Sequence, residues 1–303
     1  IMLLDSAHIQ EQDAEWKNRK AERSGAPRVE PLYTIEDAAR VREFMTTCEY
    51  QEQVTLCPGV VVEFVDAGHL LGSASILVTA TAGGGTKKLV FSGDIGNINQ
   101  PIIRDPTPIS GADYVVMEST YGDRNHTEVW SYTDDLARII DKTLARGGNV
   151  IIPSFAVGRT QELLYGMVKS NPDFPVYIDS PLAKKATTIF TGNLHGYLDE
   201  DALALVQDGT HMFNFTNLRM TETSEESKAL NMDPVPKVII SASGMCDAGR
   251  IRHHLKHNLW RKECTVVFVG YQGEGTLGRA LLEEAKSVKM FGEEIAVNAE
   301  IEN

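Results

Sequence analysis

The sequence predicts an α/β protein in which a mostly antiparallel sheet is followed by a Rossmann-like domain built on a parallel sheet. Two patterns carry this prediction. Residues 53–93 alternate Val, Ile, Thr and Phe near period two, and after residue 114 apolar strands alternate with helices of ten or more residues. The 303 residues, 42% of them hydrophobic, are enough for roughly two domains with buried cores.

The first part of the chain is expected to be helical after a short strand. Residues 1–8 predict a strand that runs into a turn, and residues 10–23 are charged and helix-prone. The Gly and Pro content of residues 24–33 predicts a loop. A second helix should follow, because Thr34 is a good N-cap and acidic residues occupy the next turn.

The segments between residues 53 and 93 are expected to form antiparallel strands. QVTLCPGVVVEFVDAG and SASILVTATA are rich in β-branched residues, and a GGGT turn separates the latter from KKLVFSG.

The rest of the chain is expected to form strand–helix units. The expected strand segments are 113–120, 149–155, 174–181, 237–245 and 264–272, and the expected helices are 131–148, 158–170, 182–193, 246–259 and 276–285.

Composition limits which partners the protein is expected to bind and in which compartment it is expected. The net charge of −13 excludes a general affinity for nucleic acids, so any such role must rest on a local basic site. No stretch approaches the ~18 unbroken apolar residues of a membrane helix. Cys48, Cys57, Cys246 and Cys264 show no CxxC or metal-ligand spacing, which predicts buried thiols in a reducing cytoplasm.

Polar residues follow several apolar runs, where ligands collect in open α/β sheets. These residues are His69, Asp94, Glu118, Ser154, Ser241 and Gln272. Histidine and carboxylate side chains serve as metal ligands or as acid–base groups. Two simpler interpretations stay open: His69 as an ordinary loop histidine, and Asp94 as the cap of a turn in GDIGN.

Three strand-to-helix turns carry an arginine on or beside the helix that follows. They are SFAVGRTQELL with Arg159, SASGMCDAGR with Arg250 and YQGEGTLGR with Arg279. Hydroxyl groups, backbone N–H groups and guanidinium groups in this layout suit phosphate. The glycines could also be simple turns and the arginines solvated.

Several segments together resemble the metallo-β-lactamase-fold nucleases of the β-CASP branch, which process RNA. The segments are LLDSAHIQEQDAE, DAGHLLGSASI, FSGDIGN, MESTYGDRNH, PSFAVGRTQELL, SASGMCDAGRIRHHL, GYQGEGTLGR and MFGEEIAVNAEI, in the family's order. The resemblance implies part of an αββα metallo-β-lactamase domain at 1–120, a β-CASP cap domain at 121–292, and a strand at 293–303 returning to the first domain.

The same resemblance implies roles for individual residues. His69 would ligate zinc, Asp94 would bridge two Zn²⁺ ions, and Glu118 would support a histidine. The residues implied in binding RNA phosphates are Ser154, Arg159, Ser241, Ser243, Arg250 and Arg279. The expected protein is a cytoplasmic, zinc-dependent ribonuclease that cleaves RNA by a two-metal mechanism, and a homodimer stays open.

The sequence departs from the family pattern in its histidines. The HxHxDH motif and the C-terminal histidine motifs are absent, so we expect a fragment with little or no activity of its own. His253, His254 and His257 are expected on a surface or facing phosphate rather than a metal. Two alternatives stay open: a non-catalytic RNA-binding or assembly subunit, and a hydrolase of small esters with the same metal fold.

Overall fold

The computed structural model describes residues 1–123, 131–192, 194 and 196–303, so the last three residues of the MESTYGDRNH segment lie outside the described residues. The chain forms two compact units, Ile1–Glu49 and Tyr50–Asn303. The first holds helices α1 (Met2–Ser24) and α2 (Ile35–Arg40) and a 3₁₀ turn, η1 (Val41–Phe44). Thr34 caps α2 in a capping box with Asp37, as predicted.

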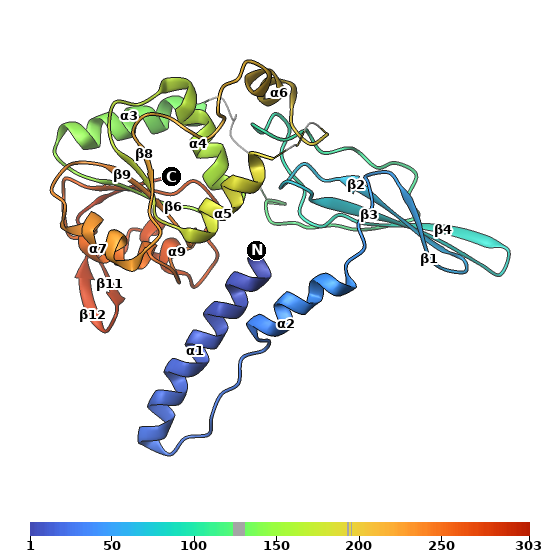
Figure 1. Ribbon diagram of the computed structural model, residues 1–303, viewed down its shortest axis with the longest axis horizontal. Coiled ribbons are helices and arrows are strands. Elements are labelled where there is room, and N and C mark those ends of the chain that lie inside the picture. The colour runs from blue at the N-terminus through green and yellow to red at the C-terminus, as the bar shows by residue number, and fades with distance from the viewer. Residues whose placement is uncertain (124–130, 193, 195) are drawn as a thin grey trace. The chain divides into compact units, whose positions relative to one another are not determined.

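The strand predicted at residues 1–8 is wrong, because α1 begins at Met2 (Figure 1). No glycine or proline interrupts the chain before Gly25, which ends the helix in the left-handed conformation at φ 70°. Ala7, Ala14 and Ala21 are buried at seven-residue spacing, which marks one face of a helix. The apolar start of the sequence therefore belongs to the helix.

The second unit contains a five-stranded sheet in the order β1-β2-β3-β4-β5. Its strands are β1 (Gln53–Cys57), β2 (Val60–Asp66), β3 (Ala74–Ala82), β4 (Gly85–Phe91) and β5 (Tyr114–Val116). The first four pair antiparallel, as predicted, and β5 joins β4 in parallel.

The same unit contains a six-stranded parallel sheet in the order β13-β10-β6-β9-β7-β8. Its strands are β6 (Val150–Pro153), β7 (Val176–Ile178), β8 (Leu218–Met220), β9 (Val238–Ser241), β10 (Thr265–Val267) and β13 (Glu300–Glu302). The helices are α3 (Ser131–Ala145), α4 (Arg159–Ser170), α5 (Pro181–Phe190), α6 (Glu200–Gln207), α7 (Ser224–Met232), α8 (Ile251–Asn258) and α9 (Leu277–Leu282). The predicted α/β class with a parallel sheet is confirmed.

Both faces of the parallel sheet are buried. Ile152 and Ile240 pack with residues of α3, α4 and α5, whereas Ile151 and Ile239 pack with residues of α7, α8 and α9. Successive strand residues point to opposite faces, so these near-continuous apolar strands need helices on both sides (Figure 1). The carboxyl ends of the strands are thereby left as the place for polar side chains.

The expected return of residues 293–303 to the first sheet is wrong. Strand β12 (Glu293–Ala296) pairs with β11 (Ser287–Met290) as a hairpin, and β13 pairs with β10. Lys142 of α3 and Arg146, the residue after that helix, both bind the Glu300 carboxylate, at 2.5 and 2.7 Å, which fixes β13 to the parallel sheet. The chain passes from the five-stranded sheet to the parallel sheet between β5 and β6. The domain boundary expected near residue 121 stays a prediction.

The four cysteines are free thiols. Cys246 and Cys264 are buried as predicted, but Cys48 is half-buried and Cys57 is exposed at the end of β1. None of the described helices has both the length and the apolar character needed to cross a membrane.

Candidate metal and phosphate site

The structure brings His69 and Asp94 together from two different loops. His69 lies in the turn between β2 and β3, and Asp94 follows β4. The His69 Nε2 and Asp94 Oδ2 atoms are 4.0 Å apart, and the two side chains are 39% and 75% exposed. One cation could therefore reach both side chains from solvent.

The turn that carries His69 is held by hydrogen bonds from its backbone N–H groups and by the conformation of Gly68. The Ser73 hydroxyl oxygen accepts hydrogen bonds from the N–H groups of His69 and Leu70, both at 3.1 Å. Gly68 has φ +60°, and a Cβ there would lie 2.4 Å from the Pro106 nitrogen. Only glycine fits this position, so the turn presents His69 in one place.

The GDIGN loop is locked against this turn. The Gly96 N–H donates to the Ala67 carbonyl at 2.8 Å, and a Cβ on Gly96 would lie 1.7 Å from the Gly68 carbonyl oxygen. The two loops therefore touch backbone to backbone, a contact that a side chain would prevent. This contact explains why two residues far apart in the sequence share one site.

Glu118 supports the same loop from the end of β5. Its carboxylate accepts a hydrogen bond from the Ile95 N–H at 2.6 Å, and its own N–H donates to Ser92 Oγ at 3.0 Å. Hydrogen bonds from Thr120 first, and then from Ile95, outweigh partial burial and lower the pKa of Glu118, to which the charge of His69 adds. Glu118 is therefore an anion that holds the residue next to Asp94.

Glu162 of α4 is a site residue that the sequence reasoning missed. Its side chain is only 14% exposed, and with His69, Leu70 and Gly158 it lines a small cavity. Burial raises the pKa of Glu162, and the charges of Arg159 and His69 oppose that shift. One signal was available: Glu162 lies between Gln161 and Leu164, both fully buried, on a helix that starts at a strand-to-helix turn.

Two serines expected to bind phosphate are buried, and their contact with phosphate stays a prediction. Ser154 is 2% exposed, and its hydroxyl pairs with that of Thr160 at 3.0 Å. Ser241 is 1% exposed, and its hydroxyl donates to the Asp179 carbonyl at 2.8 Å. Both serines lie at the ends of parallel strands that neighbouring segments cover, so the hydroxyls satisfy internal partners.

The other predicted phosphate residues remain at least partly accessible. Ser243 is half-buried, and its hydroxyl donates weakly to the Ala248 carbonyl at 3.3 Å. Arg159 and Arg279 are 41% and 37% exposed, and they pair with Glu162 and Glu283. Arg250 is 22% exposed, and its Nη1 binds Asp179 at 2.7 Å. The ion pairs leave further donors on each guanidinium.

A buried polar cluster lies around Asp179, which follows β7. His254 Nε2 lies 2.6 Å from Asp179 Oδ2, and Thr221, Ser227 and Arg250 donate to the same carboxylate. His254 is fully buried, so the prediction of a surface or phosphate-facing role is wrong for it, while His253 and His257 are exposed. Gln272, another strand-end residue, is also buried and donates to the Gly244 carbonyl at 2.9 Å.

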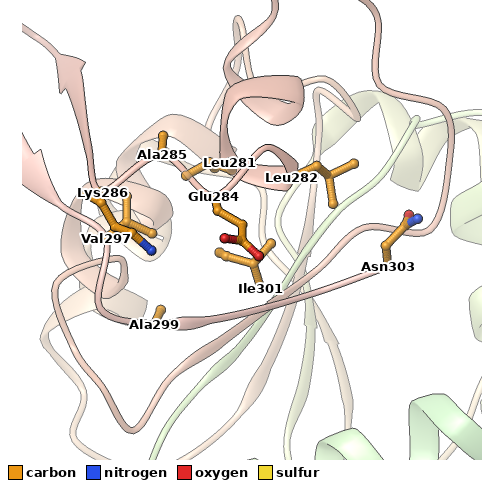
Figure 2. A pocket seen from close by; sticks show the side chains of 9 residues that line it. All are labelled: Leu281, Leu282, Glu284, Ala285, Lys286, Val297, Ala299, Ile301 and Asn303. Carbon is orange, nitrogen blue, oxygen red and sulfur yellow. The ribbon is translucent and has the colours of Figure 1, made fainter.

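A cavity with a volume of ≈ 460 Å³ lies elsewhere. It is lined mainly by apolar side chains of α9 and residues 285–301, with Glu284 and Lys286 among them (Figure 2). None of the predicted site residues lines it. His69 is the predicted site residue that lines the smaller cavity, where Glu162 joins it.

The metal ligands offered by the described residues are few. Within residues 1–123, 131–192, 194 and 196–303, no cluster of three or more His, Cys, Asp or Glu side chains could hold a metal ion. Imidazole and carboxylate are suitable zinc ligands, and the two side chains approach each other in solvent. The residues present thus fit one part of a metal site.

Comparison with known proteins agrees with this geometry. The Beta-Casp domain family matches residues 160–281, which include α8, most of α4 and much of the parallel sheet. The chain is 38% identical over 275 residues to "Ribonuclease TTHA0252" of Thermus thermophilus, covering 90% of this chain and 62% of that protein. Residues 160–281 of the chain thus match a Beta-Casp domain. The mixed α/β architecture of the chain fits a metallo-β-lactamase-fold member of that family.

Two further relatives have different names. An "RNase J-like protein" of Methanocaldococcus jannaschii is 31% identical, with 89% of this chain and 62% of the relative covered. A "Transcription termination factor FttA" of Methanosarcina mazei is 31% identical, with 80% and 39% covered. The chain thus spans less than two thirds of the length of these relatives.

Proposed function

We propose that the protein hydrolyses RNA phosphodiester bonds with the help of two zinc ions, as a β-CASP ribonuclease. The observation that carries this proposal is the approach of His69 and Asp94, 4.0 Å apart on two interlocked loops. The names of the ribonuclease relatives support RNA as the substrate. The remaining ligands would come from outside the residues that the structure describes.

In this proposal the chain's own residues have distinct tasks. His69 would ligate one cation, and the exposed Asp94 carboxylate would bridge both. Glu118 keeps Asp94 in place through the Ile95 N–H, a different role from the histidine support expected from the sequence. Zinc bound there would supply Lewis acidity and a nucleophile at neutral pH.

RNA would be bound by the accessible cationic and hydroxyl groups of the β-CASP domain. These are Arg159, Ser243, Arg250 and Arg279, and their free donors suit phosphate oxygens. Contacts to phosphate carry no direct sequence information, so the cleavage site would be chosen by other features of the RNA. A cytoplasmic location and a homodimer remain part of the proposal.

The test is Asp94→Asn in a protein that carries the complete set of metal ligands. We expect loss of RNA cleavage and of bound zinc, with an unfolding temperature close to that of the parent protein. Asp173→Asn, an exposed carboxylate on the same unit, is the matched control and should retain activity. Retained zinc-dependent cleavage by Asp94→Asn would contradict the proposal. RNA binding without any cleavage by the parent protein would favour the non-catalytic alternative.

A further inference from the structure

The segment around α8 is basic, although the whole chain has a net charge of −13. Residues 248–262 read AGRIRHHLKHNLWRK, with five Lys and Arg residues, three histidines and no Asp or Glu. An acidic protein needs a local positive surface of this kind in order to bind a polyanion. Because Arg250 binds the buried Asp179, the accessible charge of the segment comes from later residues.

Helix α8 presents one apolar face to the core and one polar face to solvent. Ile251, Leu255 and Leu259 are fully buried in the core on one side of the parallel sheet. The residues on the other side of the helix recur at spacings of three and four. They are His253, Lys256 and His257 in the helix and the exposed Trp260 just after it.

The hairpin of β11 and β12 carries an exposed phenylalanine at its turn. Met290 pairs with Glu293, so the turn consists of Phe291 and Gly292, whose φ angles are +50° and +85°. A two-residue turn with both φ angles positive favours Asn, Asp or Gly at its first position, and a bulky aromatic residue is rare there. The Phe291 side chain is 48% exposed, so the core does not explain its presence. An unfavoured residue at such a position indicates a function.

Phe291 and α8 together form an aromatic and cationic surface. The rings of Phe291 and His253 stack, with centroids 4.6 Å apart and an interplanar angle of 21°. Arg252 Cζ lies 5.0 Å from the centre of the Phe291 ring, and Lys256 Nζ lies 5.9 Å from it. Partial burial, and then neighbouring positive charges, lower the pKa of His253, so its ring is neutral at neutral pH. We call these four residues the hairpin surface.

The two cations of the hairpin surface retain donors for a ligand. Lys256 Nζ binds Glu293 at 2.7 Å, which uses one of the three donors of the ammonium group. Arg252 Nη1 donates to the Asp247 carbonyl at 3.3 Å, a long hydrogen bond. The Arg252 Nε atom is shielded from solvent and has no hydrogen-bond partner among the residues that the structure describes. An anion that accepts from these groups would therefore be stabilised.

We infer that the hairpin surface binds single-stranded RNA, with a base stacked on Phe291 and the adjacent phosphates held by Arg252 and Lys256. The inference takes RNA as the ligand from the proposed function and rests on it. Aromatic rings among cations suit single strands, because every base offers a ring face and every phosphate a charge. An acidic peptide would satisfy the cations but would offer the exposed ring no base.

The hairpin surface is separate from the site around His69. Helix α8 packs on one face of the parallel sheet, and α4, which begins against Leu70 in the His69 turn, packs on the other. RNA bound at the hairpin surface is therefore held at a second place, away from the bond that is cleaved. Such a contact raises the affinity for RNA and takes no part in the chemical step.

The experiment measures RNA binding by fluorescence anisotropy in the full protein with Asp94→Asn, in which cleavage does not interfere. Phe291→Leu removes the ring and keeps an apolar side chain, whereas Phe291→Tyr keeps the ring. We expect Phe291→Leu to weaken binding of a single-stranded oligoribonucleotide about 5-fold to 100-fold, and Phe291→Tyr to bind like the parent. Affinity for inorganic polyphosphate, which has charges but no bases, should not change. Phe44→Leu, at another exposed phenylalanine, is the matched control.

The cations are tested separately from the ring. Arg252→Gln and Lys256→Gln should each reduce the salt dependence of log K by about 0.7, the value for one phosphate contact on a single strand. Phe291→Leu should leave that dependence unchanged, because it removes no charge. Lys87→Gln breaks an exposed lysine pair with Asp113 at 2.6 Å and controls for the loss of one lysine.

Three results would overturn the inference. If all variants bind RNA like the parent, the surface has no RNA ligand, and an acidic protein partner becomes the better interpretation. If only the cation variants lose affinity, no base stacks on Phe291. If Phe291→Leu loses affinity for polyphosphate as much as for RNA, together with a lower unfolding temperature, its effect comes from the fold.

Failure of this inference can be told apart from failure of the proposed function. A parent protein that binds RNA through the hairpin surface but cleaves none would contradict the proposed function alone. A parent protein that cleaves RNA, with variants that bind RNA unchanged, would contradict only the role of the hairpin surface.

Discussion

His254 Nε2 lies 2.6 Å from Asp179 Oδ2, and neither side chain is exposed to solvent. The pair joins α8 to the end of β7, and Arg250 adds a second contact from the residue before α8. Burial by itself would raise the pKa of Asp179. Hydrogen bonds from His254, Ser227, Thr221 and Arg250 outweigh that effect and hold the pKa well below its usual range. The Asp179 carboxylate is therefore charged in the folded protein and fully compensated.

The first prediction concerns this cluster. Asp179→Asn keeps the shape of the side chain. It removes the negative charge that compensates Arg250 and that strengthens the hydrogen bonds donated by neighbouring groups. We expect the free energy of unfolding to fall by about 3 kcal/mol, as when one partner of a buried ion pair is removed. Urea unfolding followed by circular dichroism measures it. Asp135→Asn, in an exposed pair with Arg138, should leave stability close to wild type. Equal effects of the two changes would contradict the structural role of the cluster.

Local sequence signals predicted most elements of the fold because they depend on neighbouring residues. Thr34 with Asp37 marks a helix start, and the apolar runs at β6 and β9 mark buried strands. Residues 1–8 were misassigned because their apolar character resembles a strand, although they form the start of α1. Strand β8 was not predicted, because its residues Leu218–Met220 include the charged Arg219 and contain no β-branched residue.

The site was predictable in part for the same reason. His69 and Asp94 each follow an apolar run and are of types that ligate metals, and the structure brings the two residues together. Burial of Ser154 and Ser241 could not be read from the sequence, since it depends on segments that cover the strand ends. Glu162 was missed because the cavity that it lines is shared with His69, which lies far earlier in the chain, beside another sheet.

The second prediction is a dependence of stability on pH through Glu300. Hydrogen bonds from Lys142 and Arg146 lower the pKa of Glu300 from 4.5 to about 2. A depressed carboxyl pKa contributes stability above pH 4.5, and that contribution disappears as the pH falls towards 2. We expect Glu300→Gln to lose about 1 to 2 kcal/mol at about pH 7 and much less near pH 2, after allowance for solvent exposure.

Acid titration of the free energy of unfolding checks this prediction. Burial and the neighbouring Glu300 raise the pKa of Glu302, so that group shifts stability in the opposite sense. The comparison is therefore best made in a Glu302→Gln background. If the stability difference between the parent and the Glu300→Gln variant stays constant from about pH 7 to about pH 2, the charge of Glu300 is not its source.

The third prediction tests the close approach between the start of α4 and the turn that carries His69. Gly158→Ala introduces a Cβ that would lie 2.3 Å from Leu70 Cδ2, on a backbone with φ +86°. Gly209→Ala also adds a Cβ at positive φ, +77°, but into open space. We expect Gly158→Ala to cost about 2 kcal/mol more than Gly209→Ala, because overpacking adds to the backbone strain.

This prediction is checked by combining Gly158→Ala with Leu70→Ala and measuring thermal or urea unfolding of each variant. If the clash with Leu70 is the cause, Gly158→Ala should cost less in the Leu70→Ala background than in the parent. Additive effects of the two changes would mean that α4 and the His69 turn are energetically independent.

The fourth prediction separates binding of RNA from stability among the arginines. Arg279 is 37% exposed and pairs with Glu283, whereas Arg250 holds the buried Asp179. We expect Arg279→Gln to weaken binding of single-stranded RNA several-fold and to reduce the salt dependence of log K by about 0.7, the value for one phosphate contact. Fluorescence anisotropy at several salt concentrations measures both quantities.

Arg250→Gln should in addition lower the free energy of unfolding, because it leaves Asp179 with one cationic partner fewer in a buried place. Urea unfolding of the two variants makes the comparison, and Arg279→Gln should unfold close to the parent because its ion pair is exposed. If Arg279→Gln leaves the salt dependence of RNA binding unchanged, Arg279 makes no phosphate contact. If Arg250→Gln unfolds like the parent, the pair of Arg250 with Asp179 does not stabilise the fold.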